Sequence, residues 1–307
     1  MTKRRPRNPA ASVRQRLVNL ARAQKEDFQF VLTRYALERL LYRLSQSEHR
    51  DVFVLKGAML FRLWSDLPHR PTRDLDLLGR GDSSIIRFKR IFRGLCELAV
   101  AEDGLVFSAK SVRGETIKER QEYLGLRLTL ECRLEDARIP LQIDIAFGDV
   151  VIPAAAEVTY PVLLESPAPV LLAYSRESVV AEKFHAAVMW GIANSRMKDF
   201  FDLWIMARQF EFQGPLLCQA IGATFARRHT AVPNEAPTAL SLEFAEDRGK
   251  QTLWQAFVGK GKLRTDGEGL NEVVQVLRGF LMPPAMAVAA GRVLEMVWPA
   301  SGPWQPL

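Results

Sequence analysis

The chain has 307 residues, of which 48% are hydrophobic and 25% charged, and this composition excludes collagen-like, disordered and disulfide-scaffold proteins. Its formal net charge of +7 comes from the first 25 residues, which hold eight basic side chains and no acidic one. This basic arm could contact RNA, DNA or an acidic partner, or stay solvated, whereas the rest of the chain is close to neutral.

The cysteines and the apolar segments indicate the compartment. Cys96, Cys132 and Cys218 lack the spacing of a disulfide framework or a zinc cluster, which fits a reducing environment. The N-terminus has no apolar signal-peptide stretch, and the most apolar late segment, 280–298, is broken by prolines and charged residues. We therefore expect a cytoplasmic protein that neither spans nor binds a membrane.

The first half of the chain mixes helices and strands. Apolar spacings of three and four predict helices over 12–23, 27–47, 58–64 and 83–100. Short apolar runs or alternation predict strands over 52–55, 74–78, 127–133 and 141–147. A polar turn at 135–136 separates the last two strands, which we expect to form a hairpin.

The second half is predicted to be helical. Residues 152–175 hold four prolines and read as a passage between domains. Helices are then expected over 176–190, 195–209, 214–228, 250–258, 269–281 and 285–297. This order predicts an α+β protein with a basic arm at 1–24, a mixed-sheet domain at 25–165 and an all-helical domain at 166–307.

Asp74 and Asp76 form the first candidate site. One residue separates them on an expected strand, so both carboxylates point the same way, with Cα atoms roughly 6 to 7 Å apart. The two charges repel each other unless a cation lies between them, and hard oxygen ligands suit magnesium. Acidic residues on the solvated face of an edge strand would give the same pattern, so the pair alone is weak.

Asp144 strengthens the interpretation. It interrupts an otherwise apolar strand, with Ile143 and Ile145 on the opposite face. A third carboxylate on a neighbouring strand could complete a two-metal site for phosphoryl transfer. Lys56-Gly57, after a buried strand, adds a tight turn at which backbone N–H groups can approach a phosphate, although such a step is otherwise only a turn.

The helical half contains a second candidate cluster. Lys183 lies within the apolar face of the helix expected at 176–190, and Asp199 and Asp202 lie three apart on the next helix. One interpretation is a helix pair joined by ion pairs. The other is a cleft between the domains, in which Lys183 faces a triphosphate and an aspartate orients it.

Several motifs occur in a fixed order over roughly residues 25–230. They are Leu55-Lys56-Gly57, Thr72-Arg73-Asp74-Leu75-Asp76-Leu77, Gln142-Ile143-Asp144-Ile145, Phe147-Gly148-Asp149, and the segments 181–186 and 194–203. Together they resemble the AbiEii/AbiGii toxin family of nucleotidyltransferases, within the DNA polymerase β-like superfamily. The resemblance implies a minimal nucleotidyltransferase mixed sheet followed by a helical C-terminal domain.

The resemblance also implies site residues and ligands. A nucleoside triphosphate and two Mg²⁺ ions would bind between the domains. The implied catalytic residues are Asp74, Asp76, Asp144 and Lys183, the first three of them as metal ligands. The implied nucleotide contacts are Lys56, Gly57, Thr72, Arg73, Lys183, Asp199 and Asp202.

Two sequence details bear on that implied site. Gly57-Ala58 stands where the superfamily often has Gly-Ser, so a hydroxyl contact to phosphate is missing. The positive charge of Lys56 could replace that contact. Thr72 stands where relatives can carry a modifiable hydroxyl, and a phosphate beside Asp74 would disfavour a triphosphate.

The predicted function is that of a toxin in a toxin–antitoxin or abortive-infection system. We expect transfer of a nucleoside monophosphate from a triphosphate to an RNA, with a tRNA 3′ end as the expected acceptor, and a separate antitoxin protein as partner. Two alternatives stay open: a nucleotide- or RNA-binding module whose site is non-catalytic and acts by sequestration, and a two-metal nuclease.

Overall fold

The computed structural model describes residues 8–65, 69–119 and 123–307. Its contacts divide the chain into two compact units, one of 1–148 with 156–173 and the other of 149–155 with 174–307. Lys3, Arg4, Arg5 and Arg7 of the expected basic arm lie outside the described residues. The rest of that arm forms helix α1, which begins at Pro9 with the Asn8 side chain as its N-cap.

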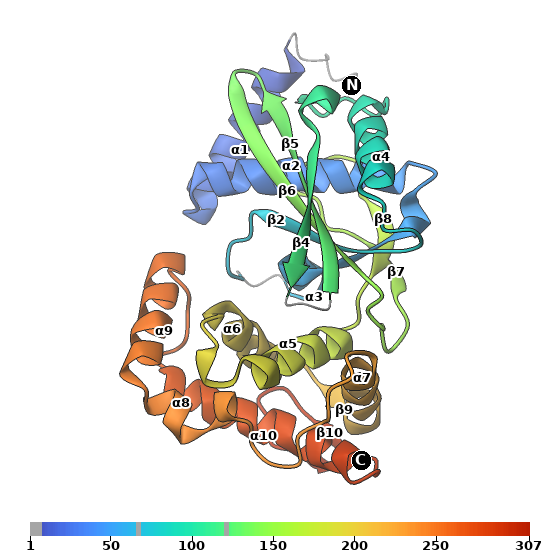
Figure 1. The fold of residues 1–307 in the computed structure, drawn as a ribbon. Coiled ribbons are helices and arrows are strands. Elements are labelled where there is room, and N and C mark those ends of the chain that lie inside the picture. The colour runs from blue at the N-terminus through green and yellow to red at the C-terminus, as the bar shows by residue number, and fades with distance from the viewer. Residues whose placement is uncertain (1–7, 66–68, 120–122) are drawn as a thin grey trace. The chain divides into compact units, whose positions relative to one another are not determined.

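The first unit is an eight-stranded mixed sheet with helices (Figure 1). Its helices are α1 (Pro9–Gln24), α2 (Phe28–Ser45), α3 (Phe61–Trp64) and α4 (Ile85–Glu97), with 3₁₀ turns η1 (Arg50–Val52), η2 (Gly57–Leu60) and η3 (Ala109–Ser111). Its strands are β1 (Phe53–Lys56), β2 (Asp74–Gly79), β3 (Leu105–Phe107), β4 (Arg113–Glu119), β5 (Tyr123–Leu134), β6 (Ala137–Phe147), β7 (Ala156–Thr159) and β8 (Val170–Ala173).

The strand order is β3-β5-β6-β2-β1-β8-β7, and β4 also pairs with β5. The expected hairpin is confirmed, since β5 and β6 are antiparallel from Leu134 and Ala137 at the turn. The segment predicted to be a passage between domains contains β7 and β8, and β8 pairs in parallel with β1. Strand β8 therefore belongs to the first unit although it lies beyond residue 165.

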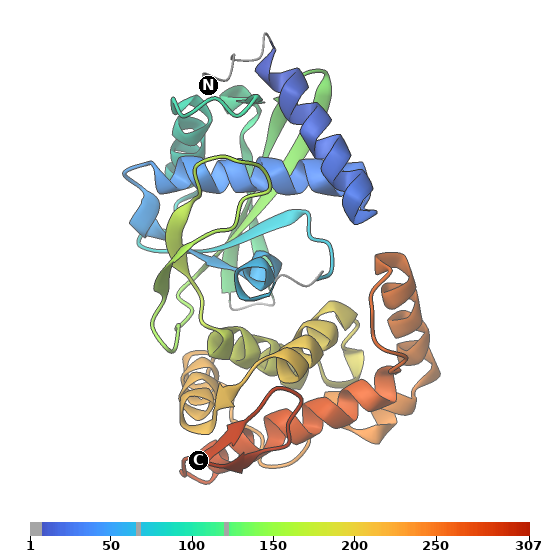
Figure 2. The ribbon, with the colours of Figure 1, turned by 180° about the vertical axis from the view of Figure 1, so that it is seen from behind.

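One face of this sheet forms the core of the first unit. Leucine and isoleucine side chains alternate inward along β2, β5 and β6, and Figure 2 shows α2 crossing the sheet. Helix α4 packs on the same face, because Phe88 contacts both Phe53 and Phe147 with ring centroids 5.6 and 5.3 Å apart. The alternation leaves polar residues on the opposite face.

The second unit is mainly helical, as expected, and adds a three-stranded sheet, β11-β10-β9, that the sequence did not predict. Its helices are α5 (Arg176–Trp190), α6 (Met197–Gln209), α7 (Gly214–Arg227), α8 (Leu242–Glu246), α9 (Arg248–Gly261) and α10 (Leu270–Ala289), with 3₁₀ turns η4 (Gly191–Ala193) and η5 (Thr238–Leu240). The strands are β9 (Phe212–Gln213), β10 (Met296–Trp298) and β11 (Gln305–Pro306).

The helix expected at 269–281 is confirmed as part of a longer helix, but the separate helix expected at 285–297 is wrong. A single helix, α10, continues through Pro283 and Pro284, and residues 296–298 form β10. Proline 284 cannot donate to the Phe280 carbonyl four residues earlier, which normally breaks a helix. Here the Trp304 indole donates to that carbonyl at 3.1 Å, so the acceptor stays satisfied.

The overall class is therefore α+β, a mixed sheet with helices followed by a mainly helical unit. Across the residues that the structure describes, no helix is both long and apolar enough to cross a membrane.

Candidate active site

Asp74, Asp76 and Asp144 share the polar face of the first unit's sheet. Strands β2 and β6 are parallel neighbours, and their register places Asp76 beside Asp144 and Asp74 beside Gln142. The residues between them, such as Leu75 and Ile143, are buried on the core face. The period of two therefore brings all three predicted carboxylates to one surface.

Lys56 and Gly57 extend this arrangement on the other side of β2. Lys56 is the antiparallel partner of Asp76. Gly57 has φ +74°, and a Cβ atom there would lie 2.6 Å from Cγ of Asp76. Only glycine allows the Asp76 side chain to approach this turn so closely. Ala58 follows as a buried residue of η2.

Arg127 completes a row across four strands. It is the partner of Asp144 in the β5–β6 hairpin. Its Nε donates to Oδ1 of Asp144 and its Nη2 donates to Oδ2, each at 2.8 Å. We call Lys56, Asp76, Asp144 and Arg127, in this order across β1, β2, β6 and β5, the charged row.

In the charged row, the two carboxylates lie between a positively charged residue at each end. The hydrogen bond to Asp144, together with the negative charges of Asp144, Asp74 and Glu115, raises the pKa of the Arg127 guanidinium against the opposing effect of burial. Gln142 Nε2 also donates to Oδ2 of Asp144, at 3.2 Å. Both oxygens of Asp144 therefore accept hydrogen bonds from neighbouring side chains.

The donor set fits a divalent cation in part. Three carboxylates on adjacent strands are the hard oxygen ligands that magnesium prefers. Within the described ranges, however, no group of three or more histidine, cysteine, aspartate or glutamate side chains is arranged to hold a metal ion. Because Asp144 already accepts hydrogen bonds from Arg127 and Gln142, a cation would compete with them for its oxygens.

A cavity of about 410 Å³ opens beside Asp74. Its polar lining comes from Arg73, Asp74, Ser111, Thr129, Glu131 and Gln142. Asp74, Gln142 and Thr129 form the row adjacent to the charged row. Arg73 is exposed, with its guanidinium carbon 4.5 Å from the centre of the Phe30 ring. Thr72 Oγ1 accepts from the backbone N–H of Asp74 at 3.4 Å and donates to its carbonyl oxygen at 3.3 Å, which fixes the start of β2.

Lys183, Asp199 and Asp202 meet within the second unit. Lys183 Nζ lies 2.6 Å from Oδ1 of Asp199 and 2.8 Å from Oδ2 of Asp202. The side chains are 14%, 5% and 0% exposed, in the same order. The helix pair joined by ion pairs, one of the two interpretations of the sequence, is thus what the second unit contains.

Arg196 adds a further charge to this cluster. Its Nε lies 2.7 Å from Oδ2 of Asp199. Burial favours the neutral form of Asp199, but the positive charges of Lys183 and Arg196 outweigh it and hold the pKa of that carboxyl below its usual value. The aspartate therefore stays ionised and fixes the lysine head group.

Another polar cluster of the second unit surrounds His185. Arg228 donates to Nδ1 at 3.2 Å and also lies 3.1 Å from the Asp149 carboxylate. Because an arginine only donates, Nδ1 is an acceptor, and Nε2 carries the proton toward Thr230 Oγ1 at 3.0 Å. Burial, with the charge of Arg228, lowers the pKa of His185 to about 4.

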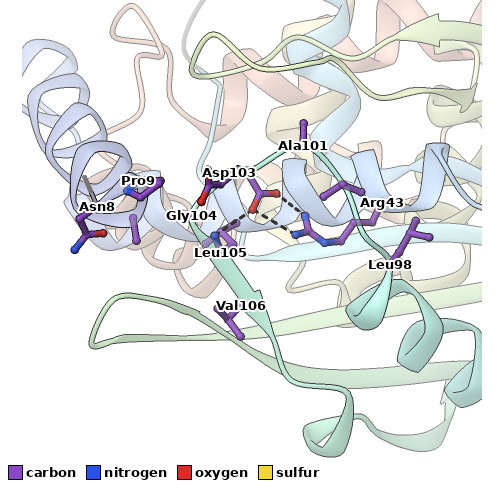
Figure 3. Close-up of a pocket in the computed structure, with 12 residues that line it drawn as sticks. Asn8, Pro9, Arg43, Leu98, Ala101, Asp103, Gly104, Leu105 and Val106 are labelled. Carbon is purple, nitrogen blue, oxygen red and sulfur yellow. Dashed lines mark hydrogen bonds and ion pairs between the residues drawn. The ribbon is translucent and has the colours of Figure 1, made fainter. Parts of the chain in front are cut away.

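A second cavity, of about 440 Å³, lies in the first unit beside the segment that leads into β3 and is shown in Figure 3. Arg43 and Asp103 lie in its wall, and Arg43 Nη1 donates to Asp103 Oδ2 at 2.5 Å. Arg39 Nε also donates to this oxygen, at 3.4 Å. Since the charges are paired, we interpret this cluster as buried ion pairs that connect α2 to the segment that leads into β3.

Two site residues were not anticipated. Arg127 and Gln142 contact Asp144, although neither residue was predicted from the sequence to belong to the site. The other predicted residues fall into two groups. Lys56, Gly57, Thr72, Arg73, Asp74, Asp76 and Asp144 lie in the first unit, and Lys183, Asp199 and Asp202 lie in the second.

Comparison with known proteins identifies the family. Residues 39–276 match the family model described as "Nucleotidyl transferase AbiEii toxin, Type IV TA system". The chain belongs to this family. The AbiEii match begins within α2 and ends within α10, so it takes in the charged row and the Lys183 cluster.

Structural comparisons add two distant neighbours of this AbiEii protein. JHP933 from Helicobacter pylori is 13% identical, with a TM-score of 0.47, over 86% of this chain and 94% of that one. A proposed nucleotidyltransferase from H. pylori is 15% identical, with a TM-score of 0.48, over 86% and 96%. No sequence among the curated proteins matches the chain.

Proposed function

We propose that this AbiEii toxin transfers a nucleoside monophosphate from a nucleoside triphosphate to the 3′ end of an RNA, with tRNA as the acceptor class. The observation that carries the proposal is the register of β2 and β6, which sets Asp76 beside Asp144 with Asp74 on the same face. Family membership supports nucleotidyl transfer as the reaction class.

In this reaction the RNA hydroxyl oxygen bonds to the α-phosphorus, the bond to the β-phosphate breaks, and pyrophosphate leaves. Asp144 takes the proton of the hydroxyl once its hydrogen bonds to Arg127 open. Lys56 and the backbone at Gly57 neutralise phosphate charge beside Asp76. Arg73 offers a further positive charge at the cavity that adjoins Asp74.

Asp74, Asp76 and Asp144 would hold divalent cations, with two Mg²⁺ as the proposed complement. When bound, such ions neutralise the phosphates and steady the attacking and leaving oxygens. Positioning and charge stabilisation account for most of the catalysis in phosphoryl transfer. The role of the protein is therefore to keep these carboxylates on one rigid face of the sheet.

For the second unit we propose a part in nucleotide binding. Lys183 would neutralise phosphate, and Asp199 and Asp202 would orient its ammonium group. A separate antitoxin is the proposed protein partner, and the cytoplasm, where triphosphates and RNA are available, is the proposed location.

One observation favours a second candidate, a nucleotide- or RNA-binding module that does not catalyse transfer. Both oxygens of Asp144 accept hydrogen bonds from Arg127 and Gln142, as they would in a purely structural role. This candidate predicts RNA binding that does not need Asp144 and that weakens steeply with salt, because phosphate contacts release counterions.

A single assay separates these functions. The protein is incubated with magnesium, total tRNA and each labelled triphosphate in turn, and the RNA is run on a denaturing gel. Lengthened, labelled RNA supports transfer, and shortened RNA supports the two-metal nuclease considered from the sequence. A band shift seen only on a native gel supports the binding module and contradicts transfer.

A further inference from the structure

Arg127 holds Asp144 in a fork. Two guanidinium nitrogens, Nε and Nη2, each donate to a different oxygen of the carboxylate at 2.8 Å. Such a planar two-bond pair is the strongest arrangement available to an arginine and a carboxylate. Gln142 adds a third hydrogen bond at 3.2 Å, so the orientation of the Asp144 side chain is fixed by its neighbours.

The pair also solves an electrostatic problem of the charged row. Asp76 and Asp144 are direct neighbours on parallel strands, about 4.8 Å apart in the backbone. Without a positive charge beside them, two carboxylates so placed repel each other. Arg127 on one side of the two carboxylates and Lys56 on the other side balance both negative charges.

A divalent cation would need the same carboxylate, and three of its roughly four lone-pair sites already accept hydrogen bonds. The oxygens that would coordinate it are those that accept from Arg127, so guanidinium and cation compete for Asp144. The side chains of Arg127 and Asp144 are 35% and 21% exposed, and water can therefore reach the pair and assist its exchange.

We propose that Arg127 is a positioning residue that holds Asp144 until a divalent cation displaces it. The arginine keeps the two carboxylates together while no ion is bound, and the ion releases the guanidinium when it binds. This inference rests on the proposed function only for the identity of the site, because it concerns the exchange of arginine for a cation.

The test measures Mn²⁺ affinity by calorimetry, without nucleotide or RNA. In Arg127→Met the competitor is gone, and we expect Mn²⁺ to bind about fivefold tighter than in the wild type. We also expect Mn²⁺ or Mg²⁺ to raise the melting temperature more in this variant than in the wild type, because the ion replaces the missing positive charge. Equal affinities in the two proteins would overturn the proposal.

Two controls separate this exchange from a general loss of positive charge. Arg133→Met removes an arginine of the same strand that pairs with Glu131 at 3.1 Å, and its Mn²⁺ affinity should equal that of the wild type. In an Asp144→Asn background, Arg127→Met should no longer tighten Mn²⁺ binding. A gain that persists in that background means that Arg127 acts through charge alone and overturns the proposal.

If Arg127→Met does not fold, Arg127→Lys keeps the charge but not the fork, and its Mn²⁺ affinity should lie above that of the wild type. An unchanged affinity in a folded Arg127→Lys protein then counts against the proposal. Since no substrate is present, a protein that fails to transfer nucleotides can still show this exchange, and the two failures are distinguishable.

Discussion

Asp76 and Asp144 lie opposite each other on two parallel strands, β2 and β6, with both carboxylates on the polar face. Replacing Asp76 by asparagine keeps the shape but removes one of the two repelling charges. We expect Asp76→Asn to lower nucleotide transfer by about 100-fold or more, while the melting temperature stays equal or rises.

Gel-based transfer and thermal melting check this prediction together, and Asp51→Asn, at an exposed side chain of the same unit, serves as the control for both. Transfer at the wild-type rate in folded Asp76→Asn would remove Asp76 from the catalytic set.

Gly57 is a position at which an added methyl group should disturb the candidate site directly. Its φ of +74° is strained for other residues, and the added Cβ would collide with Asp76. We expect Gly57→Ala to cost about 1 to 3 kcal/mol in the free energy of unfolding and to abolish transfer by moving that carboxylate.

The matched control is Gly94→Ala, at a helical glycine of α4 with no atom within 4 Å of the new Cβ. It should stabilise the protein by about 0.5 to 1 kcal/mol. Denaturant unfolding measures both changes, and equal effects of the two substitutions would contradict the argument.

Lys183 is the main counter-charge for two buried carboxylates. Lys183→Met leaves Asp199 and Asp202 without it, and we expect a loss of about 3 to 5 kcal/mol in the free energy of unfolding. Lys198→Met, at an exposed lysine of α6, the helix that carries Asp199 and Asp202, should change stability little.

Lys183→Met should also alter how the stability of the protein depends on pH. In the wild type the pKa of Asp199 is below its usual value, so its contribution is complete above about pH 3.9 and is lost as pH falls through the folded-state pKa. Without Lys183 that pKa shifts upward, toward or past the unfolded-state value, so the loss of stability on acidification should become smaller or reverse. Thermal melts between pH 3 and pH 7 test this shift, and identical profiles would contradict it.

His185 should make the protein sensitive to mild acid. Its pKa of about 4 lies below the usual 6.5, so the unfolded chain takes up a proton first as pH falls. The contribution of His185 to the free energy of unfolding is therefore complete above about pH 6.5. It declines as pH drops toward 4, by up to about 3 kcal/mol. We expect His185→Gln to remove this slope, which denaturant unfolding at several pH values would reveal.

His229→Asn, at an exposed histidine with positive φ, should keep the slope. A slope that survives in His185→Gln would assign the pH dependence to other groups.

Much of the first unit follows from alternation along its strands. Apolar residues face the core at alternate positions along β2, β5 and β6, which is enough to place Asp74, Asp76 and Asp144 on one surface. The turn at 135–136 also determines that Arg127 pairs with Asp144. Leu134 pairs with Ala137, and each residue before Leu134 pairs with the one equally far after Ala137. That pairing was available from the sequence and was overlooked.

Other features depend on partners far along the chain. Strand β8 is short and pairs with β1, which lies more than a hundred residues earlier in the chain. The local sequence pattern therefore does not predict it. The continuity of α10 depends on Trp304, whose indole N–H donates to the Phe280 carbonyl, because Pro284 has no N–H to do so. Proline pairs usually end helices, and only tertiary structure reveals this exception.

The two-faced strands β2 and β6 also limit how such a protein can change over generations. A single inserted or deleted residue in either strand would send leucines to the polar surface and aspartates into the core, so folding and chemistry would be lost at once. Single substitutions on the polar surface have no such penalty. A lineage can therefore lose this candidate site one carboxylate at a time while its architecture persists.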